Sequence, residues 1–442
     1  MQQIDFDLGI EKALDSLLAQ RLTLLAGAGL SMAAPSSLPS AYTIAAEAKR
    51  RYDAMHGASR PPLPTAIEEQ AEFFFQRDEL ASVYFRTLID QNIFAAPPNE
   101  GHYAVADLLL VQGIQTAVTT NVDILIETAG QILYGQIGTG LDQAQVAALP
   151  PDTSPLLKIH GCRQKDHDHM VWAPGQINAP PVDARIASSA HWLSNRLLDR
   201  DLLIVGYWTD WDYLNQVLET VLDQVRPSKV IVVDLADGAA FQAKAPGLYA
   251  IGEAVQNGFW HVQASGDDFL AALRRAFSRV FLRQVLSCGT QEYQHLTGNA
   301  ATQAMTEPPD IDNDALWRMR RDLEGCTPNQ PAGLRVAPNE CNVGLTVLQL
   351  RASGAASDGH YWLLNQKRIR ALRTPNQPLH RVEDAYARET APSISPDITI
   401  AIGAEADSLP SNIVRAGTAP TITRGTAGRW LTRQQAIEEL GL

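Results

Sequence analysis

The fold class is decided by residues 22–31, which read LTLLAGAGLS. Leu22–Ala26 is a short, mostly apolar run of the kind that forms a buried strand, and Gly27-Ala28-Gly29-Leu30-Ser31 follows it directly. This order is typical of the first strand of a doubly wound sheet, where small residues let backbone N–H groups approach a pyrophosphate. Met32 stands where the common dinucleotide fingerprint has its third glycine, so a tight strand-to-helix turn explains the motif equally well.

Strands and helices alternate along the chain around this motif. Apolar residues at helical spacing predict helices, and short apolar runs between them predict strands. The alternation predicts a Rossmann-like, doubly wound and mostly parallel α/β sheet that helices cover on both faces. We expect this domain to span residues 1–285, with a helical insertion at about 43–100. The other predicted strands are 117–119, 156–159, 171–172, 201–205, 229–234 and 261–262, and the predicted helices are 10–21, 43–55, 66–94, 101–112, 184–198, 211–224 and 267–284.

The character of the sequence changes after residue 285. Residues 286–312 are polar and poorly periodic, which indicates a linker or an irregular segment. Residues 313–442 contain apolar runs separated by Pro and Gly, which predict a smaller, β-rich α+β domain with a regulatory or partner-binding role. Its predicted strands are 343–350, 360–364, 398–402 and 413–414, followed by a helix at 432–440.

Composition excludes several classes of protein. The chain has 442 residues, of which 45% are hydrophobic and 19% charged, so it predicts two or three folded domains and not wholesale disorder. No apolar run is long enough to cross a bilayer, and the acidic first residues lack the basic region of a signal peptide, so we expect a cytoplasmic protein that does not contact a membrane. The four cysteines form no CxxC pair, which argues against a four-cysteine zinc ribbon and against a disulfide framework.

The negative charge is concentrated before residue 301. The formal net charge is −13, and residues 301–442 carry 15 Lys and Arg against 16 Asp and Glu, which leaves 21 against 33 for residues 1–300. An acidic body repels a polyphosphate backbone, so we expect no direct nucleic-acid binding by residues 1–300. The basic segment Gln366–Arg373, with Arg368, Arg370 and Arg373, is either a solvated face of a strand or helix or a contact surface for an acidic partner.

Three polar motifs follow predicted strands. They are Thr119-Thr120-Asn121-Val122-Asp123, Lys158-Ile159-His160-Gly161 and the segment from Gly206 to Asp212. The carboxyl ends of strands are where α/β folds bind ligands, and a histidine at that edge suits general-base chemistry. The alternatives are a helix cap at Asn121 or Thr120, a structural histidine, and a turn with a cap at Asp210 or Asp212.

The order and spacing of these motifs resemble those of the sirtuin family. A strand runs into GAGxS, TxNxD follows about ninety residues later, KxHG follows nearly forty residues after that, and a strand with a glycine turn comes next. The resemblance covers about residues 15–235. It implies a Rossmann-like NAD-binding domain with a smaller inserted module.

The resemblance also implies roles for particular residues. Asn121 and Asp123 match the residues around the nicotinamide and its ribose, and His160 matches the catalytic histidine. Asp234 is a candidate for an adenosine ribose hydroxyl, because it is an acid at the end of a predicted strand. The cofactor-binding residues that we expect are Gly27, Ala28, Gly29, Ser31, Leu38, Pro39, Thr119, Gly206, Thr209 and Asp234, and after Leu38-Pro39 the family's acidic, aromatic and arginine residues are replaced by Ser40, Ala41 and Tyr42.

The segment Gly161–Val171 departs from the deacylating sirtuins, which carry a zinc ribbon there. Only Cys162 lies in this segment. His167, Asp168 and His169 are conceivable metal ligands, but a polar loop explains them more simply, and we expect neither zinc nor another metal. Because a deacylase builds its peptide groove partly from the zinc module, the departure argues against a deacylase.

Sirtuin-like proteins without the ribbon and with an extra C-terminal domain resemble bacterial anti-phage effectors that hydrolyse NAD. The resemblance implies an NAD+ glycohydrolase that releases nicotinamide and ADP-ribose when a partner activates it, with His160 taking a proton from a ribose hydroxyl or from water. The partner is expected to be a translocase-type ATPase, a short Argonaute or a phage protein, and the chain is expected to form a homo-oligomer.

Two other functions use the same residues. An NAD-dependent protein deacylase or ADP-ribosyltransferase keeps the same pocket but needs a peptide groove. A non-catalytic NAD or ADP-ribose sensor needs no base, so the presence of both Asn121 and His160 argues against it.

Overall fold

The computed structural model describes residues 1–57, 60–198, 200–207, 212–224, 229–254, 258–333, 341–390, 395–407 and 428–442. Thr209 and the predicted strand 413–414 lie outside these residues. The chain forms two compact units, Met1–Leu273 and Arg274–Leu442. In the described part of the chain, no helix combines the length and the apolar character that crossing a bilayer requires.

The first unit is built on an eight-stranded sheet in the order β1-β8-β7-β6-β2-β3-β5-β4. Every neighbouring pair in this sheet is parallel. Chain connections run to both sides of the central strand β2, so the predicted doubly wound α/β fold is confirmed. The strands are β1 Gln2–Ile4, β2 Leu22–Ala26, β3 Ile114–Thr119, β4 Gly138–Gly140, β5 Pro155–Lys158, β6 Asp201–Val205, β7 Val230–Asp234 and β8 Phe259–Gln263.

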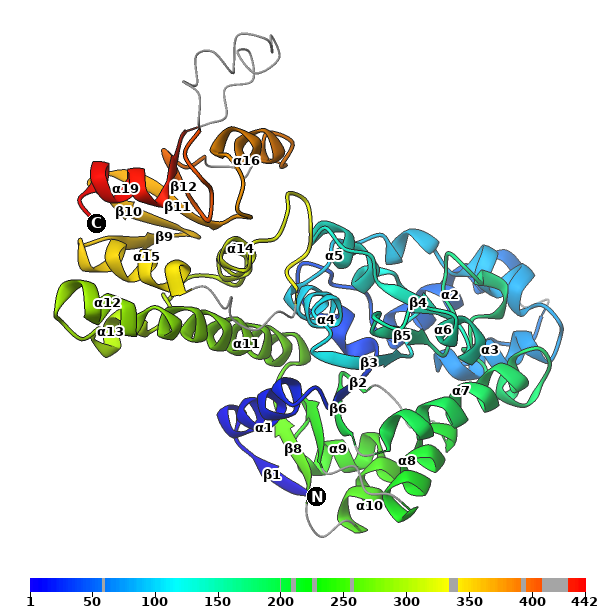
Figure 1. Cartoon of the computed structure of the whole chain (residues 1–442). Helices are drawn as coiled ribbons and strands as arrows, with labels where there is room; N and C mark the ends of the chain where they lie inside the picture. Colours follow the sequence, from blue (N-terminus) through cyan, green and yellow to red (C-terminus); the bar gives the residue numbers. More distant parts are fainter. Residues whose placement is uncertain are drawn as a thin grey trace. The chain divides into compact units, whose positions relative to one another are not determined.

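Helices cover both faces of this sheet, as the side chains of β8 illustrate. His261 stacks on Phe241 of α9, with ring centroids 5.3 Å apart, whereas Val262 meets Gly9 of α1 on the opposite face. Figure 1 shows α7, α8 and α10 grouped together, and their apolar residues share one core with the sheet. The helices are α1 Phe6–Leu18, α4 Glu100–Leu110, α5 Leu125–Ile132, α6 Gln143–Ala147, α7 Val182–Leu197, α8 Asp212–Gln224, α9 Gly238–Lys244, α10 Pro246–Ala254 and α11 Gly266–Cys288.

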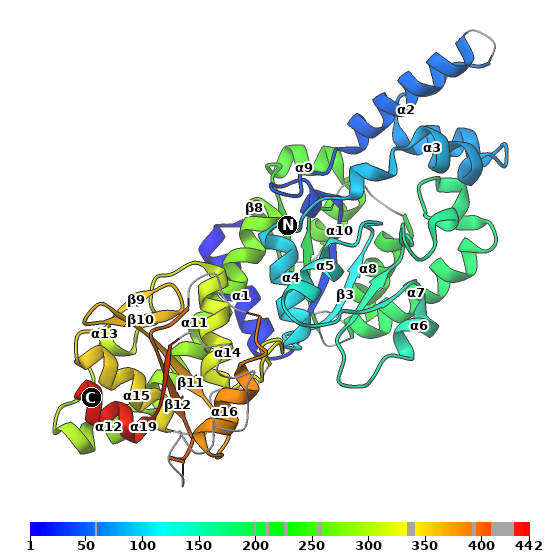
Figure 2. The same ribbon diagram turned by 90° about the horizontal axis from the view of Figure 1, so that it is seen from above.

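A helical insertion separates β2 from β3, as predicted, and it has its own apolar core. The single helix expected over 66–94 is wrong. The chain turns at Asp78, which has a φ of +56°, so that α3 ends and a π-helix begins after it. Figure 2 shows α2 and α3 beside each other in this insertion. Its elements are η1 Ala28–Ser31, α2 Ala41–His56, α3 Ile67–Phe75, η3 Leu80–Leu88 and η4 Gln91–Phe94.

The strand expected at Val171-Trp172 is also absent, and these residues lie in a loop. The backbone N–H of Val171 donates to the carbonyl of His160 at 2.9 Å, and that of Trp172 donates to the Gln176 side chain at 2.8 Å. These groups are therefore satisfied without a strand partner. Two short 3₁₀ segments, η5 His167–His169 and η6 Pro174–Asn178, flank this loop.

The second unit is a smaller α+β domain, as predicted, with a mixed sheet in the order β13-β12-β11-β10-β9. The strands β11, β12 and β13 are parallel, and β9, β10 and β11 pair antiparallel. The strands are β9 Ala356–Asp358, β10 Tyr361–Leu364, β11 Lys367–Arg373, β12 Ile398–Ile402 and β13 Arg429–Thr432, and the helices are α12 Thr290–Thr297, α13 Gln303–Thr306, α14 Asn313–Glu324, α15 Cys341–Ala352, α16 Leu379–Tyr386 and α19 Arg433–Leu440.

Residues 343–350, expected to form a strand, belong to helix α15. All eight of these residues are buried, so the run is buried on every side of the helix and its apolar residues show no helical period. Gly344 lets α15 approach the chain at Val285 and Gly289 closely, because a Cβ atom there would collide with their backbone.

The expected linker at 286–312 and the expected boundary near residue 285 do not match the structure. Helix α11 continues unbroken to Cys288, and its residues Phe281, Leu282 and Val285 belong to the core of the second unit. Residues 290–297 and 303–306 are helical. The boundary between the units therefore falls inside helix α11. The apolar residues in the later part of this helix pack into the core of the second unit.

The basic segment Gln366–Arg373 forms β11 and is not a solvated face along its whole length. Arg370 is 8% exposed and makes two hydrogen bonds to Asp322, at 2.6 and 2.9 Å, and two to Glu389, at 2.8 and 3.3 Å. Arg370 is therefore unavailable to an acidic partner. Arg368, which is partly exposed, pairs with Asp358 at 2.5 Å.

Candidate functional site

The candidate site lies at the carboxyl ends of four adjacent strands, β6, β2, β3 and β5. β2 is hydrogen-bonded to β6 on one side and to β3 on the other. The strand that precedes β2 in the sequence, β1, lies on the β6 side of it, and the strand that follows, β3, lies on the other side. Doubly wound sheets bind ligands in the crevice that opens at such a point. The three polar motifs follow β3, β5 and β6, so the topology brings them to this edge.

The glycines after β2 and β6 pack against one another. The N–H of Gly29 donates to the carbonyl of Gly206 at 3.0 Å, and the N–H of Gly27 donates to that of Val205 at 2.9 Å. A Cβ atom on Gly27 or Gly29 would collide with the backbone of Gly206, which itself has a φ of +63°. These three glycines let two turns approach closely, which is the role that the tight-turn alternative gave them.

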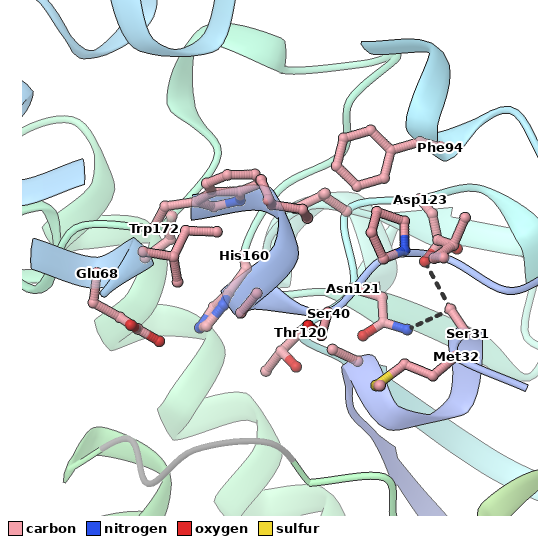
Figure 3. Close-up of a pocket in the computed structure, with 18 of the residues that line it drawn as sticks. Ser31, Met32, Ser40, Glu68, Phe94, Thr120, Asn121, Asp123, His160 and Trp172 are labelled. Carbon is pink, nitrogen blue, oxygen red and sulfur yellow. Dashed lines mark hydrogen bonds between the residues drawn. The ribbon is translucent and has the colours of Figure 1, made fainter. Parts of the chain in front are cut away.

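A pocket opens beside these turns and collects most of the predicted residues (Figure 3). Ala28, Ser31, Leu38, Pro39, Asn121, Asp123 and His160 line it. Gly27, Gly29, Thr119, Gly206 and Asp234 are not part of its lining, and Thr209 lies outside the described residues. The remaining lining residues are Met32, Ser40, Ala41, Ile44, Ile67, Glu68, Phe94, Thr120, Val122, Val171, Trp172 and Tyr207.

Ser31 is the centre of a buried hydrogen-bond network on one wall of the pocket. The Asn121 side-chain amide donates to Ser31 Oγ at 3.1 Å, and Ser31 Oγ donates to Asp123 Oδ2 at 2.9 Å (Figure 3). His102 Nε2 lies 3.1 Å from the same hydroxyl. A serine hydroxyl has one donor and two acceptor positions, so these three partners use it fully.

The tautomer of His102 follows from its two partners. His102 Nδ1 accepts the backbone N–H of Asn99 at 3.2 Å, so Nε2 carries the proton and donates to Ser31. Burial lowers the pKa of His102 to about 4, which keeps the ring neutral at physiological pH. His102 is a site residue that the sequence reading missed, although Asn99 three residues earlier, at the start of α4, signals a capping pair.

Asn121 presents one side-chain atom without a partner. Its backbone N–H donates to Thr119 Oγ1 at 3.0 Å, and Thr119 donates in turn to the Ala26 carbonyl at 2.9 Å. Thr119 therefore positions the loop from below the pocket. The amide nitrogen of Asn121 is held by Ser31, whereas its Oδ1 is buried and makes no hydrogen bond within the described part of the chain.

Asp123 is held on both carboxylate oxygens. Oδ2 accepts from Ser31, and Oδ1 accepts the backbone N–H of Leu125 at 3.0 Å, at the start of α5. The buried ammonium of Lys158 donates to the Asp123 carbonyl and pairs with Glu127 at 3.0 Å. The carboxylate is thus a fixed part of the wall.

His160 lies deeper, where it contacts helix α8. Its Nε2 is 2.7 Å from the hydroxyl of Tyr213, and the histidine is 4% exposed. Burial, and to a smaller extent the charge of Arg185, lowers the pKa of His160 to about 3. The imidazole is therefore neutral at physiological pH, which is the form that a general base requires.

Asp234 lies at the end of β7, as expected, but its carboxylate already has partners. It is 2.5 Å from the ammonium of Lys244 and accepts the N–H of Ala236 at 2.9 Å. Its suggested contact with an adenosine ribose stays a prediction.

The segment that replaces the zinc ribbon is fixed by ion pairs. Arg86 of η3 pairs with Asp168 at 2.6 Å, and Arg185 of α7 pairs with Asp166 at 2.6 Å. His169 Nδ1 lies 2.7 Å from Asp166. Among the residues that the structure describes, no group of three or more His, Cys, Asp or Glu side chains is arranged to hold a metal ion.

Two further walls come from residues that no motif marked. Glu68 and Ile67 reach the pocket from the first turn of α3, and Phe94 and Trp172 add aromatic rings from η4 and from the loop after β5. Glu68, Ile67 and Phe94 belong to the helical insertion, far in sequence from the motifs after β3 and β5, so the fold brings them to the site.

Comparison with known proteins relates part of the chain to the SIR2-like domain. Residues 115–246 match the family model described as a SIR2-like domain, and no curated protein matches the sequence significantly. A solved Sir2 homologue–NAD complex is 19% identical with a TM-score of 0.35, and the alignment covers 60% of this chain and 94% of that chain. A structure of Sir2 enzymes concerned with their mechanism and regulation is 14% identical with a TM-score of 0.33, and the alignment covers 62% and 98% of the two chains. The match over residues 115–246 supports a sirtuin-like family assignment for this chain.

Proposed function

We propose that the protein is an NAD+ glycohydrolase that cleaves NAD+ to nicotinamide and ADP-ribose. The observation that carries the proposal is Oδ1 of Asn121, which is buried and makes no hydrogen bond among the described residues. Ser31 holds the amide nitrogen of the same side chain, in a pocket that His160 also lines. A buried polar atom without a partner is costly unless a ligand completes it. The carboxamide of nicotinamide and the ribose hydroxyls supply the donor that this oxygen lacks.

The chemistry needs few groups. The bond between the anomeric carbon and the nicotinamide nitrogen breaks, the electron pair leaves with nicotinamide, and positive charge develops on the ribose. Water then adds to the anomeric carbon and loses one proton. Asn121 orients the leaving group, and neutral His160 accepts a proton from a ribose hydroxyl or from the water.

Hydrolysis is favoured over deacylation by the segment after His160. A deacylase needs a groove for a peptide beside the pocket, and the family builds part of that groove from its zinc module. In this chain the corresponding loop is short, and its acidic residues Asp166 and Asp168 pair with Arg185 and Arg86. Water is then the available acceptor for the ribosyl group.

An enzyme that consumes NAD+ must be restrained, because constant activity would empty the cell of it. We therefore infer a cytoplasmic effector in bacterial anti-phage defence, active as a homo-oligomer or with a translocase-type ATPase, a short Argonaute or a phage protein. The separate unit Arg274–Leu442 is the part of the chain that we assign to this control.

The test is release of nicotinamide by the full-length protein from NAD+ without any peptide, followed by chromatography, alone and with lysate of phage-infected cells. We expect release that Asn121→Ala and His160→Ala abolish and that His295→Ala, an exposed control on α12, preserves. Turnover that requires an acetylated peptide would replace the proposal with a deacylase. Binding of NAD+ without turnover under either condition would replace it with a sensor.

A further inference from the structure

We propose that Glu68 is the group that takes the proton from the attacking water in this reaction. The inference deepens the proposed function and rests on it. It assigns a second proton acceptor, from the helical insertion, to a site whose motif residues Asn121, Asp123 and His160 follow strands.

Glu68 reaches the pocket from the first turn of α3 and is partly buried. Figure 3 shows its side chain directed toward the side of the cavity where His160 and Thr120 lie. Ile67 precedes it in the chain and also lines the pocket, and Figure 3 shows Trp172 on the same side of the cavity as Glu68. A water molecule on this side of the pocket therefore meets Glu68 as its charged acceptor.

The carboxylate of Glu68 is uncommitted. Within the described residues it makes no hydrogen bond or ion pair, whereas Glu72, one turn later on α3, accepts from the Gly175 N–H at 2.8 Å and from Gln76 at 3.0 Å. Asp123, the other carboxylate in the lining, has both oxygens occupied by Ser31 and Leu125. Of these two pocket carboxylates, only Glu68 has two oxygens that no protein donor holds within the described residues, so only Glu68 can turn both of them toward a reacting water.

His160 is less well placed for the same step. Its Nε2 is engaged by the Tyr213 hydroxyl at 2.7 Å, on the side of α8. The two residues therefore accept protons from different groups: His160 from the ribose hydroxyl and Glu68 from the water. As the water oxygen bonds to the anomeric carbon, one water proton passes to the carboxylate, which becomes a neutral acid and later returns the proton to solvent.

A structural role for Glu68 predicts something different. An acidic side chain in the first turn of a helix interacts favourably with the helix dipole, so its loss lowers stability without changing the course of the reaction. A group that acts only on water affects hydrolysis but not cleavage of the nicotinamide bond. The cleaved ribosyl cation can also recombine with nicotinamide, so labelled nicotinamide reports on cleavage separately from hydrolysis.

The experiment supplies the full-length protein with NAD+ and labelled nicotinamide and measures both hydrolysis and exchange of label into NAD+. For Glu68→Gln we expect hydrolysis to fall by roughly 100-fold, as for loss of a general base, while exchange stays within about threefold, so that the ratio of exchange to hydrolysis rises. Glu69→Gln, the exposed neighbour on the same turn, should leave the ratio unchanged.

A second variant, Glu68→Ala, distinguishes loss of the carboxylate from misfolding of the protein. Glu68→Ala should recover hydrolysis when formate is added, because a small carboxylate can fill the vacated space. Equal loss of exchange and hydrolysis in Glu68→Gln, or unchanged hydrolysis, would overturn the role of Glu68 while the wild-type protein still cleaves NAD+. Failure of the wild-type protein in both assays, with and without infected-cell lysate, would instead overturn the proposed function.

Discussion

The hydroxyl of Tyr213 lies 2.7 Å from Nε2 of His160, and both side chains are buried. Burial raises the pKa of the tyrosine well above its usual value, so its oxygen keeps the proton throughout the physiological range. The pair joins β5, through the residues that follow it, to the first turn of α8. Tyr213 is therefore a positioning residue for the imidazole that the sequence motif marks.

Replacement of Tyr213 by phenylalanine tests this relationship. The change keeps the ring but removes the hydroxyl, so a buried nitrogen of His160 loses a partner at a cost of about 1–3 kcal/mol. We expect the rate of nicotinamide release to fall by roughly tenfold or more, with a smaller change in the KM for NAD+. Tyr249→Phe, a partly buried tyrosine of α10, is the control and should change neither rate nor melting temperature. Equal rates of nicotinamide release in Tyr213→Phe and Tyr249→Phe would contradict the positioning role of Tyr213.

The two buried histidines of the site predict a loss of stability in mild acid. Burial lowers the pKa of His102 to about 4 and that of His160 to about 3, against about 6.5 in the unfolded chain. Between pH 6.5 and 4 these histidines are protonated in the unfolded chain but not in the folded chain, so the free energy of unfolding falls as the pH falls. Each histidine contributes about 1.4 kcal/mol per pH unit, which makes the free energy of unfolding roughly 4 kcal/mol lower at pH 5 than at pH 7 from these two alone.

Denaturant titrations at several pH values check this slope. His102→Gln removes one titrating group and should reduce the average slope between pH 4.5 and 6.5 by about 1 kcal/mol per pH unit, whatever it does to the absolute stability. His295→Gln, at an exposed position of α12, should leave the slope unchanged. A slope that His102→Gln does not alter would mean that His102 titrates normally in the folded protein.

The sequence was informative where chemistry is local to a strand end. Asn121, Asp123, His160 and Ser31 line one pocket because parallel strands carry the residues after them to the same edge. Glu68, His102 and Tyr213 could not be predicted in the same way. They stand on helices, and their part in the site depends on how those helices pack on the sheet and the insertion.

The fold shows the same division. Buried strands such as Leu22–Ala26 and Asp201–Val205 were predictable because a run of five mostly apolar residues between turns is too short for a typical helix and suits a buried strand. Helix α15 was not, since its run of eight buried residues hides the helical period. The edge strands β1 and β4 were missed because three residues each carry too little pattern.

The close approach of the glycine turns predicts a contrast between two glycine substitutions. Gly206 has a φ of +63°, and a Cβ atom there would stand against the backbone of Gly29 and Leu30. Gly206→Ala should lower the free energy of unfolding by at least about 1–2 kcal/mol from the left-handed conformation alone, and it should also weaken NAD+ binding by displacing the loop that carries Ser31. Gly238→Ala, in the first turn of α9 with open space around it, should be neutral or slightly stabilising. Thermal melting together with calorimetric titration of NAD+ compares the two variants, and equal destabilisation would show that the two turns do not depend on the glycine.

Two arginines on one strand provide the corresponding test for the second unit. Arg370 of β11 is buried against Asp322 and Glu389, whereas Arg368, two residues earlier, pairs with Asp358 at side-chain exposures of 39% and 38%. Removal of one partner from a buried ion pair leaves the other charges without compensation and costs about 3–5 kcal/mol, whereas an exposed pair contributes about 0–1 kcal/mol. We therefore expect Arg370→Met to destabilise the second unit by several times as much as Arg368→Met. Hydrogen exchange of the amides in β11 and α14 measures this directly in the full-length protein. Similar exchange rates in the two variants would mean that the Arg370 ion pairs are open to water. Arg370 could then contact an acidic partner.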